Sequence, residues 1–562
     1  MHATDPSPIA TARGQPLRAG RMSGGDALVE SLRRWAIDTV FGLPGVQLDD
    51  LFDALQRQSD TVRVIHTRHE QGAAYMALGS ALATGNPAVF AVVPGPGVLN
   101  ATAALATAYA CNARVLCLTS TIPSALIDRE YGALHEIRDQ LGILQRLTKW
   151  AARATHAGEI PALVDEAFRQ LLTGRPRPVA LEIPPDVLSQ RSLVSFAAEK
   201  PALVQPALDP EAVTAAARLI RESREPLIVV GSGALHANEE VRQLAHLLQA
   251  PVVSRQLGRG VLSDRDELAM PAAIGNDLWK SADLVIGIGT RLQQLREWGQ
   301  DARLKVVRID VDPAEMSRLA PPDAAILAEA SPATAALTTA LKQQGEVGRP
   351  SRMESLRALK HRFRTEIAET IQPQVGYLDA IRSALPDDGV LVDEMTQVGY
   401  SARYAFPVYQ PRAFISSGYQ CTLGYGFATA LGAQVAVGRR RVVSVTGDGG
   451  FLYNVQELAT AVLHRIPLVT IVFSDGHFGN VRRIQQNKFQ GRVFASKLHN
   501  PDFRRLAEDF GAVGLRAQTP EELLQLLRGT LTADQPALIE VPMDIDAVAS
   551  PWKYVHSRRV RP

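Results

Sequence analysis

Continuous apolar runs alternate with helical patterns along almost the whole chain. Several runs have the composition of parallel strands that are covered on both faces: 88–93, 114–120, 226–231, 283–289, 306–312, 442–449 and 468–476. Segments rich in Ala and Leu lie between them. The alternation predicts an α/β protein built from doubly wound parallel sheets.

Two linker-like segments, around 190–210 and 343–352, interrupt this alternation and divide the chain into pieces of similar size. A chain of 562 residues is too long for one hydrophobic core, so several domains are expected. We predict five parts: a flexible tail at 1–20, a first domain at 21–190, a central domain at 205–343, a third domain at 355–550 and a C-terminal tail at 551–562.

Composition and charge narrow the class of protein. Apolar residues make up 46% and charged residues 21%, with a net charge of +2, so nothing indicates nucleic acid or an anionic membrane as a partner. No apolar run is long enough for a membrane span. The three cysteines, Cys111, Cys117 and Cys421, form no CxxC pair, which is typical of a reducing cytoplasm. We therefore expect a cytoplasmic protein with small-molecule partners, and solvated arginines in the C-terminal tail.

The most informative motif follows the apolar run that ends at Thr446. A glycine turn, 447–450, is expected to open a helix from about Asn454, and such a turn lets backbone N–H groups approach phosphate oxygens. Asp448 lies in this turn, and Asp475 follows the next predicted strand, so both carboxylates are expected at the same edge of a parallel sheet. Carboxylate oxygens and phosphate oxygens are ligands that Mg²⁺ prefers. Taken alone, the glycine turn is a weak signal, and an ordinary tight turn is the better interpretation.

Two motifs together resemble a known family. GDGGF at 447–451 followed by SDGHFGN at 474–480 resembles the thiamine-diphosphate (ThDP) motif, and RHEQGAA at 68–74 is similar to a segment of the acetolactate synthase, pyruvate oxidase and benzaldehyde lyase family. The resemblance implies that Asp448, Asp475 and the carbonyl of His477 hold Mg²⁺. It also implies that Glu70 activates the cofactor by hydrogen-bonding its pyrimidine ring.

The resemblance extends from about Gly24 to about Pro551 through further matching stretches at 41–55, 94–110, 181–187 and 423–436. It implies that the three domains are a pyrimidine-binding, a central and a diphosphate-binding domain. It also implies a homodimer or homotetramer in which Glu70 and the metal site meet across a subunit interface. The cofactor-binding residues that it implies are Pro94, Asn100, Thr396, Gln397, Cys421, Leu423, Gly447, Gly449, Gly450, His477, Phe478 and Gly479.

Cys421 is the clearest departure from the family pattern in the cofactor site. The family usually has glycine there, and its carbonyl accepts a hydrogen bond from the cofactor. A residue with a Cβ resists positive φ. The backbone at Cys421 is therefore expected to be either ordinary or slightly strained.

The residues expected around the substrate leave the reaction open. His135 is a candidate proton shuttle, because histidine ordinarily titrates near neutrality, although a loop or helix-cap histidine is an equally good interpretation. Decarboxylases of the family place an acid where this chain has Val481, and the synthases a tryptophan where it has Ile484. The remaining pocket candidates are Val46, Gln47 and Trp552, the last as a lid residue.

These residues favour a carboligase of acetolactate-synthase-like type. Such an enzyme decarboxylates a 2-oxo acid and passes the resulting enamine to a carbonyl acceptor. The alternatives are a 2-oxo acid decarboxylase or hydroxyketone lyase, a flavin-dependent oxidase, and a non-catalytic ThDP-binding protein. The chain keeps Arg291 but lacks the family's flavin signature, so FAD is possible but not expected.

Overall fold

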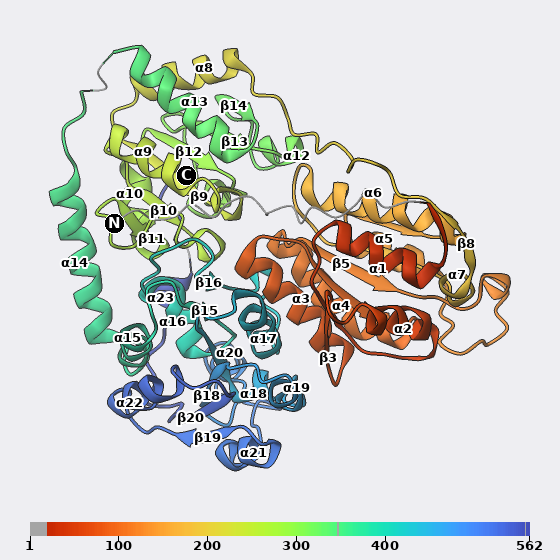
Figure 1. Ribbon diagram of the computed structural model, residues 1–562. Helices are drawn as coiled ribbons and strands as arrows, with labels where there is room; N and C mark the ends of the chain where they lie inside the picture. The colour runs from red at the N-terminus through yellow and green to blue at the C-terminus, as the bar shows by residue number, and fades with distance from the viewer. Residues whose placement is uncertain (1–18, 346–347, 557) are drawn as a thin grey trace.

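The computed structural model describes residues 19–345, 348–556 and 558–562, and its architecture is three parallel sheets of six strands (Figure 1). Helices cover the sheets, so the predicted α/β class with three doubly wound domains is confirmed. The predicted flexible tail at 1–20 lies almost wholly outside the described residues. No helix among the described residues is long and apolar enough to cross a membrane.

The first sheet has the strand order β3-β2-β4-β5-β7-β6. Its strands are β2 (Thr39–Gly42), β3 (Arg63–His66), β4 (Ala88–Val92), β5 (Val115–Thr119), β6 (Trp150–Arg153) and β7 (Val179–Glu182). Its helices are α1 (Gly24–Arg34), α2 (Asp49–Arg57), α3 (Glu70–Thr84), α4 (Pro96–Cys111), α5 (Gln140–Leu147), α6 (Ile160–Leu172) and α7 (Pro185–Ser189). An antiparallel pair, β1 (Gly20–Ser23) with β8 (Arg191–Val194), extends past residue 190.

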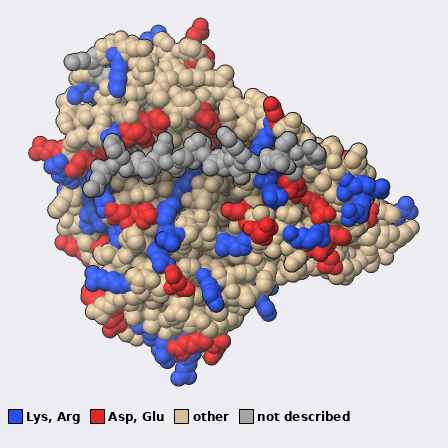
Figure 2. Space-filling view, viewed as in Figure 1, with Lys and Arg blue, Asp and Glu red and all other residues tan. Residues whose placement is uncertain are grey.

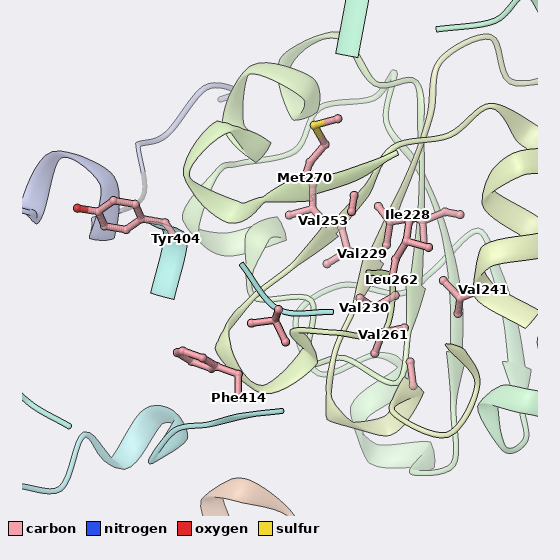
Figure 3. Close-up of a cluster of buried hydrophobic side chains, with 14 of the residues drawn as sticks. Ile228, Val229, Val230, Val241, Val253, Val261, Leu262, Met270, Tyr404 and Phe414 are labelled. Atoms are coloured by element: carbon pink, nitrogen blue, oxygen red, sulfur yellow. The ribbon is translucent and has the colours of Figure 1, made fainter. Parts of the chain in front are cut away.

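The central sheet has a different order, β11-β10-β9-β12-β13-β14. Its strands are β9 (Pro226–Val230), β10 (Val252–Ser254), β11 (Ala269–Pro271), β12 (Leu284–Ile288), β13 (Lys305–Asp310) and β14 (Ala324–Leu327). Its helices are α8 (Pro210–Glu222), α9 (Asn238–Leu248), α10 (Ala272–Ser281), α11 (Gln294–Glu297), α12 (Pro313–Met316) and α13 (Ala330–Gln343). Ile228, Val229 and Val253 belong to a buried aliphatic cluster, with the consecutive residues Ile228 and Val229 on opposite faces of the sheet (Figure 3).

The third sheet, β16-β15-β17-β18-β20-β19, repeats the strand order of the first. Its strands are β15 (Val390–Val392), β16 (Phe414–Ile415), β17 (Val442–Gly447), β18 (Val469–Ser474), β19 (Val513–Arg516) and β20 (Ala537–Pro542). Its helices are α14 (Met353–Thr370), α15 (Gln374–Ala384), α16 (Gln397–Ala405), α17 (Gly426–Val437), α18 (Asp448–Phe451), α19 (Glu457–Leu463), α20 (Gly479–Lys488), α21 (Phe503–Phe510), α22 (Pro520–Thr530) and α23 (Trp552–Val555).

Short 3₁₀ turns occur in all three domains: η1 (Val46–Leu48), η2 (Ser124–Leu126), η3 (Ala157–Glu159), η4 (Ser232–Ala234), η5 (Gln256–Gly258) and η6 (Gly418–Gln420).

The first and third domains share one core where α3 packs against α17. Small residues bring the two backbones together: a Cβ on Gly79 would lie 1.8 Å from the carbonyl oxygen of Thr429, and one on Gly432 would lie 1.9 Å from that of Met76. The Glu457 carboxylate accepts hydrogen bonds from the backbone N–H groups of Arg68 and His69, just before α3 begins. These contacts fix the start of α3 relative to the third domain.

The C-terminal tail is docked on the central domain. Arg561 is only 5% exposed, and its guanidinium donates to the carbonyls of Trp279, Lys280 and Ala282 at the end of α10 and to Asp301. The expectation of a wholly solvated arginine tail is therefore wrong for Arg561, because the unpaired carbonyls at a helix C-terminus attract a cation. Elsewhere, basic and acidic side chains are interspersed over the face shown in Figure 2, as the net charge near zero suggests.

Candidate functional site

Glu70 lies at the carboxyl edge of the first sheet. It opens α3 directly after β3, and its side chain is 12% exposed. Its Oε2 accepts a hydrogen bond of 3.0 Å from the Asn100 amide on α4. Pro94 lies in the loop between β4 and α4, so three of the residues that the sequence indicated follow β3 and β4, which lie on either side of β2 in one sheet.

Gln47 and His135 form a second group of the same domain. Gln47 follows β2 and is 6% exposed, whereas its neighbour Val46 is 67% exposed. His135 Nδ1 lies 3.0 Å from Gln47 Oε1, and Gln47 Nε2 donates to the carbonyl of Leu134 at 3.0 Å. The backbone of His135 has a φ of 65°, in the left-handed region that residues other than glycine rarely adopt.

Gln140, which the sequence reasoning missed, ties the loops of this edge together. It is buried, accepts from the N–H of Gly95 at 2.7 Å and donates to the carbonyl of Ser120 and the carboxylate of Glu182. Gly95 has a φ of 59°, and a Cβ there would lie 2.4 Å from the carbonyl oxygen of His135. Only glycine fits this position, so the loop after β4 and the segment around His135 press directly on each other.

Asp448 and Asp475 lie at the carboxyl edge of the third sheet, after the neighbouring strands β17 and β18. Asp448 is buried, and its Oδ2 accepts from the N–H of Gly476 at 2.7 Å and the amide of Asn500 at 2.6 Å. Burial and the nearby charge of Asp448 raise the pKa of Asp475 to about 6. The Asp448 carboxylate therefore lies close enough to Asp475 to disfavour the ionisation of Asp475.

The glycine turn has a tightly packed shape. A Cβ on Gly449 would lie 2.8 Å from the Phe478 ring, and one on Gly450 would lie 2.1 Å from Glu394 Oε1. The turn opens the four-residue helix α18, and the next helix, α19, begins at Glu457. The helix expected from about Asn454 begins slightly later, at Glu457, and the Asn454 side-chain amide donates to the carbonyl of Gly424.

Glu394 is the second residue that the sequence reasoning missed, although its neighbours in VDEMTQ were named. It is fully buried, and accepts hydrogen bonds from the N–H of Gly424 and the hydroxyl of Thr446. Burial raises the pKa of Glu394 to about 7. This carboxyl joins the loop that carries Leu423 to the end of β17 and the glycine turn. The only signal in the sequence is an acidic residue directly after an apolar strand.

The other residues indicated for the third domain gather around this edge. Ideal Cβ positions place Thr396 beside Gly447, and both Gln397 and Asp475 beside Gly479. His477 Nδ1 lies 2.9 Å from the carbonyl oxygen of Asp475, and the N–H of Phe478 donates to the carbonyl of Ser496. The named residues of this group therefore converge on the Asp448–Asp475 edge: Thr396, Gln397, Gly447, Gly449, Gly450, His477, Phe478 and Gly479.

Cys421 has a φ of 47° and a ψ of 42°. Of the two conformations expected for this position, the structure has the strained one, because a residue with a Cβ occupies the left-handed region. The side chain is exposed, and Leu423 two residues later is half-buried.

Helix α20 carries apolar side chains that have little cover within the chain. Val481 is 46% and Ile484 is 40% exposed, and the helix contains no Asp or Glu. Trp552 of α23 lies between α16 and α20. The centre of its ring is 4.7 Å from that of Tyr400 and 4.5 Å from the guanidinium carbon of Arg483. The C-terminal segment thus contacts α20 directly.

Within one chain, the third domain reaches the first edge, just before α3, through Glu457 and not through the candidate residues of that edge. Among the described residues, no hydrogen bond joins Gln47, Glu70, Asn100 or His135 to the third domain. Large exposed apolar side chains flank both edges: Val46, Leu99 and Leu134 on the first domain, and Tyr453, Val481 and Ile484 on the third.

A further crevice of about 500 Å³ lies at the central sheet. It opens where the strand order reverses between β9 and β12, the position at which open α/β sheets bind ligands. Gly231, Gly289 and Arg291 line it, and it extends to Tyr419 and Cys421 of the third domain. The Arg291 guanidinium lies 4.4 Å from the centre of the Tyr419 ring.

The chain belongs to the thiamine pyrophosphate enzyme family. Family models match the N-terminal TPP binding domain at residues 22–143, the central domain at 213–337 and the C-terminal TPP binding domain at 395–541. The two matched TPP-binding domains imply thiamine diphosphate as the cofactor. This confirms the family that the motifs at Glu70 and Asp448 indicated.

Relatives named for different reactions match almost the whole chain. A probable 2-ketoarginine decarboxylase, AruI of Pseudomonas aeruginosa, is 33% identical over 92% of this chain and 94% of its own length. A probable acetolactate synthase large subunit of Methanocaldococcus jannaschii is 32% identical over 93% and 92%. The acetolactate synthase isozyme 1 large subunit of Escherichia coli is 29% identical over 94% and 96%. The chain is thus a ThDP-dependent enzyme of the acetolactate synthase and decarboxylase family.

Proposed function

We propose that Asp448, Asp475 and the carbonyl of His477 hold Mg²⁺, which anchors the diphosphate of the cofactor. The donor set fits this metal, because Asp448 raises the pKa of the adjacent Asp475 and a divalent cation between two carboxylates would relieve that repulsion. Among the described residues, no three His, Cys, Asp or Glu side chains cluster, so the remaining ligands would be carbonyl, phosphate or water oxygens. The amide oxygen of Asn500 beside Asp448 also has no hydrogen-bond partner among the described residues.

Glu70 would act at the other end of the cofactor. Its carboxylate is largely buried and is oriented by the Asn100 amide, as a proton-exchanging group needs to be. Bound thiamine diphosphate supplies a nucleophilic carbon and an electron sink for the carbon–carbon bond change. The protein's part is to orient the cofactor, exclude water and exchange protons.

We propose that the enzyme decarboxylates a 2-oxo acid and transfers the remaining acyl unit to a carbonyl acceptor. The observation that carries this proposal is the apolar face of α20, where Val481 and Ile484 stand beside the metal loop and no acidic residue is present. Without a placed acid on this helix, protonation is slower and a second carbonyl compound can compete for the acyl unit.

Simple decarboxylation to an aldehyde is the second candidate. Two observations favour it: His135 is held at the edge that carries Glu70, and one extensive relative is named a decarboxylase. A histidine at this place would supply the proton that α20 lacks.

We also propose a homodimer, or a tetramer built from two dimers, in which the Glu70 edge of one chain faces the Asp448 edge of the other. The exposed apolar side chains that flank both edges support this assembly. FAD is not expected in the central crevice. A visible absorbance spectrum of the purified protein tests that expectation.

Product analysis decides between the two reactions. The purified enzyme with ThDP and Mg²⁺ is incubated with a panel of 2-oxo acids, with and without aldehyde or 2-oxo acid acceptors. CO₂, free aldehyde and ligated product are measured together. Ligated product that matches CO₂ supports transfer, and aldehyde that matches CO₂ supports decarboxylation. No CO₂ from any acid on the panel would contradict both.

A further inference from the structure

We infer that Gln47 is a positioning residue that holds neutral His135 as the tautomer with its proton on Nδ1 and its lone pair on Nε2. The inference rests on the proposed function only in giving His135 a proton-transfer role. The hydrogen-bond pattern that carries it stands on its own geometry.

The carbonyl of Leu134 determines how the Gln47 amide is turned. This carbonyl oxygen can only accept, and it lies 3.0 Å from Gln47 Nε2. Turning the amide over would place Gln47 Oε1 against the carbonyl oxygen of Leu134. Gln47 is only 6% exposed, so these two acceptors would face each other without a donor. The amide oxygen, Oε1, must therefore face His135.

The Gln47 oxygen in turn determines the state of the ring. Oε1 is an acceptor and lies 3.0 Å from His135 Nδ1, so Nδ1 must carry a hydrogen. In the neutral ring the other nitrogen, Nε2, is then left with a lone pair. Because Gln47 has no ionisable group, this constraint fixes the tautomer without adding a charge.

The surrounding backbone holds the ring in place at a cost. His135 has a φ of 65°, which is unfavourable for any residue with a Cβ, and its carbonyl presses on Gly95. Gln140 fastens Gly95 from the other side. A strained conformation persists only where its surroundings impose it, and it commonly marks a functional residue. Nε2 is thus available to take up a proton or, once protonated, to return it.

The test compares two nearly isosteric variants by ¹⁵N NMR with labelled histidine. Gln47→Glu keeps an acceptor for Nδ1–H, and Gln47→Met removes it. The His135 signals are identified by their loss in His135→Gln. His246, whose Nε2 lies 2.8 Å from Asp266 on the central domain, gives an unchanged reference in each variant. Spectra are recorded near pH 8.5, where histidine is ordinarily neutral.

We expect a protonated Nδ1 in the wild-type protein and in Gln47→Glu, and a shift towards protonated Nε2 in Gln47→Met. With a productive 2-oxo acid, Gln47→Met should lower kcat about 10- to 100-fold, with KM changed much less. Gln47→Glu keeps the acceptor for Nδ1–H but sets a carboxylate oxygen against the Leu134 carbonyl, so it should recover only part of that loss. Melting curves verify that each variant is folded.

A protonated Nε2 in the wild-type protein would overturn the inference, whether or not the enzyme turns over. The expected spectra together with an unchanged kcat in Gln47→Met would overturn the positioning role. Absence of all turnover in the wild-type protein would count against the proposed function instead, and the NMR result would still decide the tautomer.

Discussion

The first and third domains are built on sheets with the same strand order, yet their carboxyl edges carry different chemistry. At the first edge, Glu70 pairs with a neutral amide and His135 with another. At the third edge, Asp448 and Asp475 lie together, and burial and the charge of Asp448 oppose the ionisation of Asp475. The shared topology decides where loops meet, and the side chains in those loops decide what each edge binds.

The polar residue that ties the loops together also differs between the two edges. Gln140 at the first edge and Glu394 at the third are both buried, and each joins loops that follow separate strands. One is neutral and the other ionisable. The comparison therefore predicts that the first domain serves proton exchange and the third serves binding of the cofactor and metal. It also predicts that the stability of the two domains depends differently on pH.

The largest expected effect is the loss of turnover when a candidate carboxylate is neutralised at either edge. The cause of the loss should differ between the two edges. Glu70→Gln should lower kcat about 10²- to 10⁴-fold while ThDP still binds, because only proton exchange is removed. Asp448→Asn should lose activity chiefly through weaker binding of ThDP and Mg²⁺, because an anionic ligand is removed. Titration of ThDP at several Mg²⁺ concentrations, beside steady-state rates, separates the two.

Asp475→Asn serves as the matched control for the third edge. It should weaken metal-dependent binding in the same way as Asp448→Asn, since both carboxylates are proposed ligands. If Glu70→Gln abolished cofactor binding to the same extent, the division of labour between the edges would be wrong.

Mixing the two inactive variants tests whether the edges meet between chains. In a dimer of one Glu70→Gln chain and one Asp448→Asn chain, one site carries both changes and the other carries neither. Random exchange makes half of the dimers mixed, so about a quarter of wild-type activity should return.

Subunit exchange has to be verified for this test with tagged chains that co-purify after mixing. Either variant mixed with wild-type protein gives the upper reference. Proven exchange without recovered activity would show that each site is formed within one chain.

Much of the fold was predictable because buried parallel strands leave a plain signature of apolar runs. The family motifs also located Glu70 and Asp448. Gln140 and Glu394 were not predictable, because each acts through partners distant in sequence, such as Glu182 for Gln140 and Gly424 for Glu394. The docking of Arg561 was missed for the same reason, since its partners are the carbonyls at the end of α10.

The two tie residues should differ in how stability depends on pH. The pKa of Glu394 is raised to about 7, so folding retains its proton where the unfolded chain has lost it. Its contribution to stability is present at low pH and falls as the pH rises from about 4.5 to about 7. Glu394→Gln removes this titration, so relative to wild type the variant should gain roughly 1–3 kcal/mol between pH 5 and pH 8.

Gln140→Leu is the counterpart at the first edge. It leaves the N–H of Gly95 and the carbonyl of Ser120 without their partner, and should cost about 2–4 kcal/mol at both pH values. Urea unfolding of the apoprotein measures both variants. A constant difference between Glu394→Gln and wild type across this range would show that Glu394 does not titrate there.

The smallest expected effect concerns strain at Cys421, which joins the third edge to the central crevice. Its φ of 47° is unfavourable for a residue with a Cβ, and glycine adopts this conformation freely. Relief of strain outweighs the greater entropy of an unfolded glycine, so Cys421→Gly should stabilise the protein by up to about 1 kcal/mol. Cys421→Ala keeps the Cβ and should give no gain. Equal urea midpoints for the two variants would mean that the left-handed backbone at Cys421 does not lower stability. The third edge would then hold its loop without strain, unlike the first edge at His135.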